Sequence, residues 1–428
     1  MGIMSRFKKS GSQETTPTNS VMDTSGRNRE NYEKEMGEHE AVRIFRPRIF
    51  AMVFVVSLGG MIFGYDTGQI SGFLEMPDFL RRFGNTTDAS GAPAFTNVRS
   101  GTIVGLLSIG TLIGAIIAAP IADKFGRRAS IVVWNIVFII GVIVQIATST
   151  RWYQIVVGRW VAGLGVGGLS VLTPMYQSET APRQVRGALV SCYQLFITLG
   201  IFVAYCINYG TDQAYRYSAP SWRITMGVGF IWPTLMAIGI CFLRESPRWD
   251  YRNGKIDRAR VTAAKSYGVS ENHWEVQREM REIKEKLDAE NAGGKHSIIE
   301  VFTGPRMAYR TLLGMTLQMF QQLTGANFFF YYGTSIFTAT GINNSFVTSM
   351  ILGGINFGTT FLALYVVEHF GRRKSLITGG LWMFMCFLVF ASVGTYRLDQ
   401  NNPQNTPQAG AVMIVFAALF IFGYAATW

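Results

Sequence analysis

The stretch Asp123–Arg128, which reads DKFGRR, decides the fold class, because it returns almost unchanged as EHFGRR at Glu368–Arg373. Each copy is a short charged segment between two long apolar runs. Such a duplication predicts a membrane protein built from two related halves. Related halves create a cavity that can be exposed alternately to each side of a bilayer. Transport of a solute across a membrane is therefore our first hypothesis.

The composition indicates a bilayer, rather than water, around most of the chain. Hydrophobic residues make up 49% of the 428 residues and charged residues 15%, which favours membrane helices over several soluble domains. A membrane helix needs about 20 mainly apolar residues. We therefore predict an all-α polytopic membrane protein with about ten spans. These are residues 50–74, 100–121, 130–148, 153–175, 188–209, 224–243, 311–333, 345–367, 375–395 and 411–428.

The net charge of +12 reports the orientation of the spans and not nucleic-acid binding. Most of the 39 Lys and Arg residues lie before residue 49 and in the loops after the second, fourth, sixth and eighth spans. Cytoplasmic loops carry such an excess of basic residues. We therefore predict a cytoplasmic N-terminus, a lipid bilayer as the surroundings and no nucleic-acid partner.

Four segments follow from this pattern. The polar stretch after the sixth span is rich in Ala, Glu, Lys and Arg, and it predicts helices over Lys255–Tyr267 and Trp274–Asn291, with Gly268 as a stop. The segments are a disordered cytoplasmic tail (1–48), an N-terminal six-helix half (49–243), a cytoplasmic helical linker (244–310) and an incomplete C-terminal half (311–428).

Asp66 lies within an otherwise apolar span, where an unpaired carboxylate costs several kcal/mol. Arg159 is the basic residue predicted well inside a span, so a relation between the two satisfies both groups most simply. Protonation of Asp66 would then release Arg159 and bias the equilibrium between conformations. A static ion pair, or an Asp66 near the external interface, remains an equal alternative.

The seventh predicted span carries Gln318, Gln321, Gln322 and Gly325 on one helical stripe, followed by Asn327 and an aromatic run. Amides donate and accept hydrogen bonds, as the hydroxyls of a neutral sugar require, and aromatic faces cover its C–H surface. Amide contacts between helices are the alternative. Further candidates for the same cavity are Gln194, Asn356 and Trp428.

Other kinds of chemistry find little support in the sequence. The glycine-rich stretch Gly163–Gly168 lies inside a span and lacks the Lys-Ser/Thr ending of a phosphate-binding loop. We find no Ser/His/Asp or Cys/His arrangement, and the four Cys residues show no metal-ligand spacing. We therefore predict no enzymatic activity, no cofactor and no metal.

From about residue 50 to its end, the chain resembles the sugar porter family of the major facilitator superfamily, and most closely the fungal hexose transporters. The resemblance rests on motifs in both halves and is highly specific because they occur together. Besides the two charged copies, they are Phe63–Gly68 (FGYDTG), Gly158–Arg159, Pro174–Glu179 (PMYQSE), Glu245–Trp249 (ESPRW) and Gln321–Asn327 (QQLTGAN).

The resemblance implies the major facilitator fold, with twelve spans in two six-helix halves around a central sugar site. Proton-coupled relatives use the aspartate matching Asp66 with the arginine matching Arg159, although some facilitative relatives keep a similar aspartate. The implied sugar-binding residues are Gln194, Gln321, Gln322, Asn327, Asn356 and Trp428. The implied cytoplasmic gate, which stabilises the outward-open state, comprises Asp123, Arg127, Arg128, Glu179, Glu245, Arg248, Glu368, Arg372 and Arg373.

Together these observations predict a multi-pass plasma-membrane transporter of a hexose, glucose first, that works by alternating access as a proton symporter. A facilitative uniporter, a non-transporting glucose receptor and an inactive truncated isoform remain alternatives. The chain ends at Trp428, midway through the tenth predicted span, whereas the resemblance implies twelve. We therefore expect full transport to require the further helices.

Overall fold

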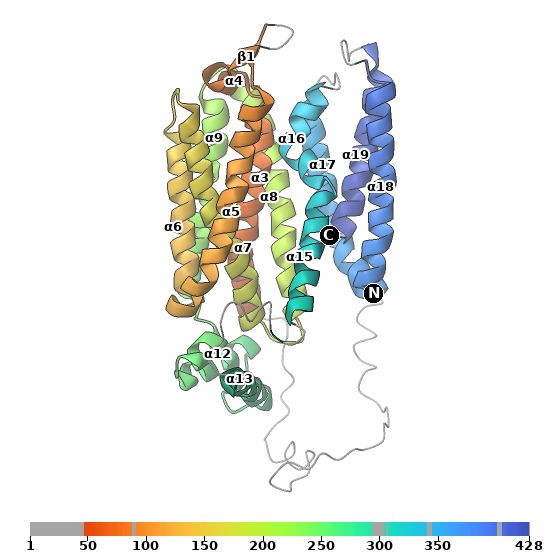
Figure 1. Ribbon diagram of the computed structural model, residues 1–428. Coiled ribbons are helices and arrows are strands. Elements are labelled where there is room, and N and C mark those ends of the chain that lie inside the picture. The colour runs from red at the N-terminus through yellow and green to blue at the C-terminus, as the bar shows by residue number, and fades with distance from the viewer. Residues whose placement is uncertain are drawn as a thin grey trace.

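The molecule consists of two helical bundles side by side, with a smaller group of helices beneath one of them (Figure 1). Within the part of the chain that the computed structural model describes, nine helices are long and apolar enough to cross a membrane. This confirms the predicted all-α class. The described residues are 47–87, 91–292, 304, 307–339, 345–399 and 405–427.

All six spans predicted for the N-terminal half are helical. The sixth span, Pro220–Phe242, is made of two consecutive helices with a short break between them. The helices of this bundle are α3 (Pro47–Phe73), α5 (Asn97–Phe125), α6 (Arg127–Ile146), α7 (Trp152–Thr180), α8 (Arg186–Tyr215), α9 (Pro220–Val228) and α10 (Ile231–Phe242).

Glycines allow α5 and α7 to pack with their backbones almost in contact. A Cβ atom on Gly114 of α5 would lie 2.1 Å from the carbonyl oxygen of Leu164, and one on Gly163 of α7 would lie 2.3 Å from that of Leu107. Small residues permit this approach in membrane helices, where close packing replaces the hydrophobic effect as the driving force. The glycine-rich stretch in α7 is therefore a packing surface.

One prediction is wrong in the C-terminal bundle. The seventh predicted span, 311–333, is not one continuous helix, because the chain breaks at Thr324–Gly325 and Gly325 takes a φ of +83° that favours glycine. The second piece, α16 (Ala326–Ala339), has 14 residues and is too short to cross a bilayer alone. The helices of this bundle are α15 (Met307–Leu323), α16 (Ala326–Ala339), α17 (Ser345–Phe370), α18 (Arg372–Tyr396) and α19 (Pro407–Thr427).

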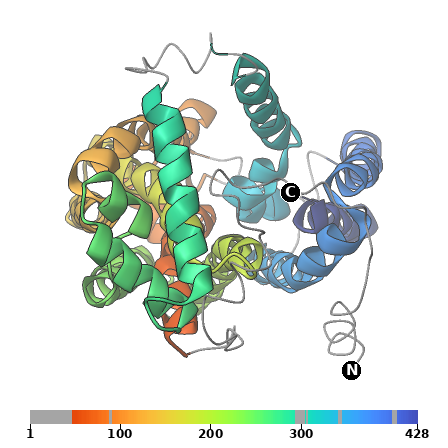
Figure 2. The ribbon, with the colours of Figure 1, turned by 90° about the horizontal axis from the view of Figure 1, so that it is seen from below.

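The two ends of the molecule differ. At the end that we call the linker end, α11 (Pro247–Arg252), α12 (Ile256–Tyr267) and α13 (Trp274–Ala292) form a small subdomain, and α12 stops at Gly268 with a φ of +64°. Figure 2 shows α13 beneath the N-terminal bundle, to one side of α18 and α19. The opposite, loop end carries α4 (Pro77–Phe83) and a short antiparallel pair, β1 (Thr86–Thr87) and β2 (Pro93–Ala94).

The two bundles meet along α8 and α17, and again where the loop end of α3 contacts α16. At the second contact, the Ser71 and Thr334 hydroxyls lie 2.8 Å apart, and the Thr334 and Ser349 hydroxyls lie 3.1 Å apart. In contrast, α15, which approaches the linker end, has no buried residue among those described. The halves are therefore joined by polar contacts at the loop end.

Candidate functional site

A central cavity of about 440 Å³ lies between the two bundles. Its walls come from α3, α5 and α8 on one side and from α15, α16, α17 and α19 on the other. None of the described residues that line it carries a charged side chain. Five of the six predicted sugar-binding residues do line it, and the sixth, Trp428, lies outside the described residues. The five are Gln194, Gln321, Gln322, Asn327 and Asn356.

The break at Gly325 positions three of these amides. It ends α15 just after Gln321 and Gln322 and starts α16 just before Asn327, so both helix ends face the same cavity. The Asn327 amide nitrogen donates a hydrogen bond to the Gln322 side-chain oxygen. The Thr324 hydroxyl donates to the Gln321 carbonyl at 2.7 Å and caps the end of α15. A continuous helix would not bring both sets of amides to one place.

Asn356 of α17 differs from these amides because it is only 2% exposed. Its side-chain oxygen is buried and has no hydrogen-bond partner in the described part of the protein. A buried polar atom without a partner costs about 1–3 kcal/mol. A ligand hydroxyl in the adjoining cavity would remove this cost.

Sequence reasoning missed the hydroxyl residues of the cavity. Thr67, Ser108, Thr111 and Thr198 line it, but each is a single hydroxyl within an apolar span and gives no sequence signal of its own. The aromatic run contributes in part, since it also supplies packing residues. Phe330 and Tyr331 line the cavity together with Phe63 and Tyr424, while Phe329 packs against Phe390 and Phe420.

Asp66 and Arg159 lie next to each other in the N-terminal bundle. The distance between Asp66 Oδ2 and Arg159 Nη2 is 3.6 Å, and both side chains are fully buried. Gln69 donates a hydrogen bond of 2.7 Å to the other carboxylate oxygen. None of the three Arg159 nitrogens has a hydrogen-bond partner in the described part of the chain. The pair is thus held mainly by the attraction of opposite charges and by few hydrogen bonds. Protonation of the carboxylate would remove that attraction.

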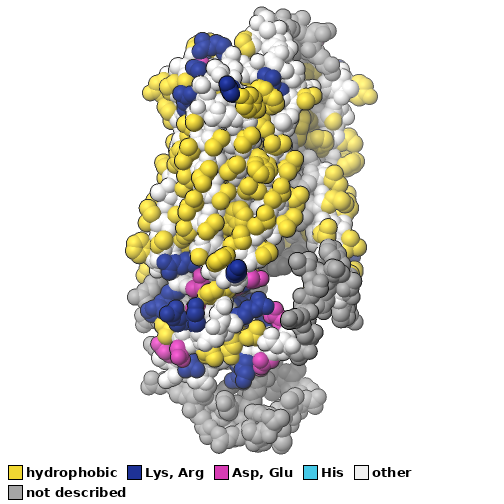
Figure 3. All heavy atoms as spheres, turned by 60° about the vertical axis from the view of Figure 1, so that its left-hand side comes forward, with side chains coloured by type: hydrophobic (Ala, Val, Ile, Leu, Met, Phe, Trp, Pro, Cys, Tyr) yellow, Lys and Arg dark blue, Asp and Glu magenta, His cyan; other side chains and the backbone are white. Residues whose placement is uncertain are grey.

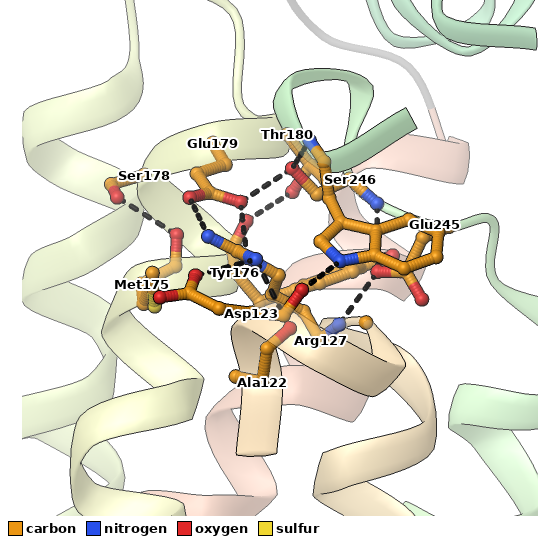
Figure 4. A network of polar contacts seen from close by, with 12 residues as sticks. Ala122, Asp123, Arg127, Met175, Tyr176, Ser178, Glu179, Thr180, Glu245 and Ser246 are labelled. Atoms are coloured by element: carbon orange, nitrogen blue, oxygen red, sulfur yellow. Dashed lines mark hydrogen bonds and ion pairs between the residues drawn. The ribbon is translucent and has the colours of Figure 1, made fainter. Parts of the chain in front are cut away.

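The first charged copy forms a network at the linker end (Figure 4). Arg127 contacts Glu179 at 3.0 Å and Asp123 at 3.2 Å, and Ser246 donates a hydrogen bond to the same glutamate. Glu245 accepts hydrogen bonds of 2.9 Å and 3.2 Å from the backbone N–H groups of Arg127 and Arg128. The network therefore ties α5, α6 and α7 to the start of the linker.

Gly126 makes this arrangement possible. Its φ of +93° turns the chain between α5 and α6, and a Cβ atom there would lie 2.5 Å from a carboxylate oxygen of Glu245. The second copy has the same turn, because Gly371 has a φ of +80°, but no atom of the described residues lies within 4 Å of its Cβ position. The repeated sequence therefore gives a repeated backbone turn, and among the described residues a carboxylate, that of Glu245, contacts the turn of the first copy only.

The structure does not join all predicted gate residues. Arg248 Nε is buried without a hydrogen-bond partner among the described residues. Arg128 contacts Glu245 through its backbone N–H and not through its side chain among the described contacts. The side chain of Arg373 is exposed. The side chains of Glu368 and Arg372 lie outside the described part of the chain.

A second set of ion pairs, missed from the sequence, ties the linker to the N-terminal bundle. Arg183, just after α7, contacts Glu279 at 3.0 Å, and Arg186 contacts it at 3.4 Å. Burial raises the pKa of Glu279, but the hydrogen bond from Arg183 and the charge of Arg186 outweigh it and lower the pKa overall. Burial and the Glu279 charge raise the pKa of Tyr267 to about 12. The glutamate is therefore ionised at neutral pH and pairs with both arginines.

At the loop end, Glu75 lies between the halves and accepts a 2.5 Å hydrogen bond from the Ser335 hydroxyl of α16. Burial raises the pKa of Glu75, and the hydrogen bond offsets only part of this effect. The carboxyl therefore holds a proton more tightly while the loop end is closed than it would in water.

Two helical bundles, an uncharged polar cavity between them and apolar outer surfaces define a membrane transporter of the major facilitator fold. Solved structures agree: the partially occluded inward-open xylose transporter XylE from E. coli aligns with a TM-score of 0.72 and 26% identity, covering 89% of this chain and 85% of that one. The XylE proton:xylose symporter bound to 6-bromo-6-deoxy-D-glucose gives a TM-score of 0.72 and 27% identity, covering 89% and 80%.

The family model described as "Sugar (and other) transporter" matches residues 52–428, and the chain belongs to that family. A low-affinity glucose transporter of Kluyveromyces lactis is 47% identical over 379 residues, covering 87% of this chain and 66% of that protein. A high-affinity fructose transporter of Schizosaccharomyces pombe is 44% identical, covering 88% and 70%. The chain thus spans about two thirds of the length of these curated relatives.

Proposed function

We propose that the protein moves a hexose, glucose first, across the membrane by alternating access of its two bundles. The observation that carries this proposal is the central cavity, because among the described residues five amides and six hydroxyl side chains line it and no charged side chain does. Such a lining suits a neutral, polyhydroxylated solute. The glucose and fructose transporters among its relatives support a hexose in particular.

In this proposal Gln194, Gln321, Gln322, Asn327 and Asn356 bind the sugar, and Trp428 completes the set. The segments 49–243 and 311–428 are the moving halves, and the linker 244–310 restrains them. Hydroxyl contacts close the loop end, while α15 is unburied near the linker end. This arrangement supports an inward-facing state, with the linker end in the cytoplasm.

We further propose proton symport. The buried Asp66–Arg159 pair supports this, because Asp66 Oδ2 has no hydrogen-bond partner among the described residues and could take up a proton. The network around Arg127 and Glu179 would hold one conformation in preference to the other, with Arg128, Arg248, Glu368, Arg372 and Arg373 taking part in other states. Facilitated uniport uses the same cavity without the proton.

The excess of Lys and Arg at the linker end supports a cytoplasmic linker and N-terminus. The relatives are transporters by name, and we propose that this chain is likewise a transporter and not an enzyme, in the plasma membrane and without cofactor or metal.

The test is uptake of radiolabelled glucose by transporter-null cells that express a version of the chain completed with the further helices that full transport is expected to require, compared with residues 1–428 alone, and with binding of the same sugar measured on both purified proteins. We expect saturable uptake that unlabelled hexoses inhibit more strongly than charged sugar acids. A protonophore should reduce accumulation if symport operates and leave it unchanged in a uniporter. Binding without uptake would support the receptor, and the absence of both, despite surface expression, would refute the proposal.

A further inference from the structure

A second cavity, of about 350 Å³, lies at the linker end of the N-terminal bundle, away from the central one. Its volume is in the range of small-ligand sites. Its walls come from the start of α3, the end of α7, the end of α10 and one face of α12. The residues that matter below are Met52, Thr180, Phe242, Arg244, Thr262 and Lys265.

The cavity lies at the depth where the apolar spans end. One span begins at Ile49 and another ends at Phe242, and both residues line the cavity. Phe242 is 85% exposed, whereas Met52 is buried in the wall. Figure 3 shows Lys and Arg side chains gathered below the apolar outer surface at this end of the molecule. Lipid phosphates occupy this boundary between hydrocarbon and water.

The charge of the cavity is positive. Arg244 and Lys265 line it, and none of the described residues that line it carries a carboxylate. Lys265 forms no ion pair within the described residues. The charges of Lys255, Arg258 and Arg244 all act on the one carboxylate of Asp250, so Asp250 does not neutralise Arg244 alone. An anionic ligand would meet uncompensated positive charge here.

The walls are held in place by hydrogen bonds. The Tyr176 hydroxyl donates to the Arg244 carbonyl at 2.5 Å, which fixes the backbone just after α10 against α7. Thr180 donates to the Tyr176 carbonyl at 2.6 Å, and Ser266 donates to the Thr262 carbonyl at 3.0 Å. The hydroxyl oxygens of Thr180 and Ser266 can therefore still accept hydrogen bonds from a ligand, which favours a headgroup with donors of its own.

We propose that this cavity binds one anionic phospholipid of the adjacent leaflet. Its phosphate pairs with Arg244 and Lys265, and its acyl chain leaves along the exposed ring of Phe242 and the apolar surface of α10. The lipid then ties α12 to the membrane-facing ends of α3 and α10. This inference does not depend on which solute the central cavity carries.

The test uses the full chain purified in detergent and measures its melting temperature while short-chain phosphatidylserine is added. The same titration is made with short-chain phosphatidylcholine, soluble glycerophosphoserine and inorganic phosphate. The variant is Arg244→Gln with Lys265→Gln. The control is Arg260→Gln with Lys286→Gln, which removes the same charge from exposed residues of α12 and α13 that do not line the cavity.

We expect phosphatidylserine to raise the melting temperature saturably, and the soluble anions and phosphatidylcholine to have little effect. Each cation near a lipid phosphate is worth about fivefold in affinity, so the double variant should need ~30-fold more lipid for half saturation, and the control should match the parent protein. Equal weakening in the control would show a general charge effect. An equal response to glycerophosphoserine or phosphate would make the ligand a free anion. A lipid effect that appears only after deletion of residues 1–46 would assign the cavity to that segment. Each of these three results overturns the proposal.

Discussion

Gln322 lies where α15 ends, in contact with Asn327 and the central cavity, and it illustrates how much depends on single amides. Gln322→Ala removes a group that donates and accepts, so we expect a loss of about 1–1.5 kcal/mol in sugar binding, which is roughly a five- to tenfold higher KM for uptake. Gln318→Ala is the matched control, because Gln318 is exposed one turn earlier on the same helix and does not line the cavity. Unchanged kinetics for the first variant would remove Gln322 from the site.

The charge of Asp66, and not only its contacts, is expected to matter for transport. Asp66→Asn keeps the shape of the side chain and the possibility of a hydrogen bond to Gln69, but it leaves Arg159 without a counter-charge. We expect proton-driven accumulation of sugar to be lost while exchange of labelled for unlabelled sugar continues. Exchange also shows that the variant is folded. Normal accumulation would mean that the pair is structural.

At the scale of elements, the two copies of the charged motif make the same turn with different neighbours. Gly126→Ala strains a positive φ and places a methyl group against Glu245, whereas Gly371→Ala strains a similar φ where no described residue lies within 4 Å of the added methyl group. Each variant should lose about 1–3 kcal/mol of folding free energy from backbone strain. Gly126→Ala should lose more, and its melting temperature should fall further than that of Gly371→Ala. Equal losses would show that Glu245 moves aside at no cost.

The break between α15 and α16 could not be predicted from the sequence. Gln318, Gln321 and Gln322 fall on one stripe in a continuous helix, and that pattern predicted the cavity-lining amides. It did not indicate that Gly325 ends the helix, because a single glycine is tolerated inside many membrane helices. The positive φ at Gly325 redirects the chain so that Asn327 reaches the same cavity.

The two halves can be locked together at the scale of the whole molecule. The Ser71 and Thr334 hydroxyls lie 2.8 Å apart across the loop end, which is compatible with a disulfide after Ser71→Cys and Thr334→Cys. Oxidation should then hold the loop end closed and stop uptake, and a reducing agent should restore it. The matched control pair is Thr211→Cys with Thr225→Cys, whose hydroxyls lie 3.1 Å apart within one bundle.

Oxidation of the control pair should leave uptake unchanged, since its bridge does not join the moving halves. Continued uptake by an oxidised Ser71–Thr334 pair, with the bridge verified by mass spectrometry, would contradict alternating access through this end of the molecule.

The sequence by itself determined the membrane class, the two-half plan, the spans apart from the seventh and most amides of the cavity. These features could be predicted because the length of an apolar run, a repeated motif and a run of amides are all visible in a short stretch of sequence. The tertiary structure decided which faces of the spans point inward. In α5, Leu107 is 1% exposed and Ile109 is 51% exposed, yet both are apolar, because lipid and protein interior select the same side chains. Three features depend on which face of each helix points inward and on residues far apart in the chain. They are the hydroxyl side chains of the central cavity, the contact of Glu245 with Gly126 and the basic cavity beside α12.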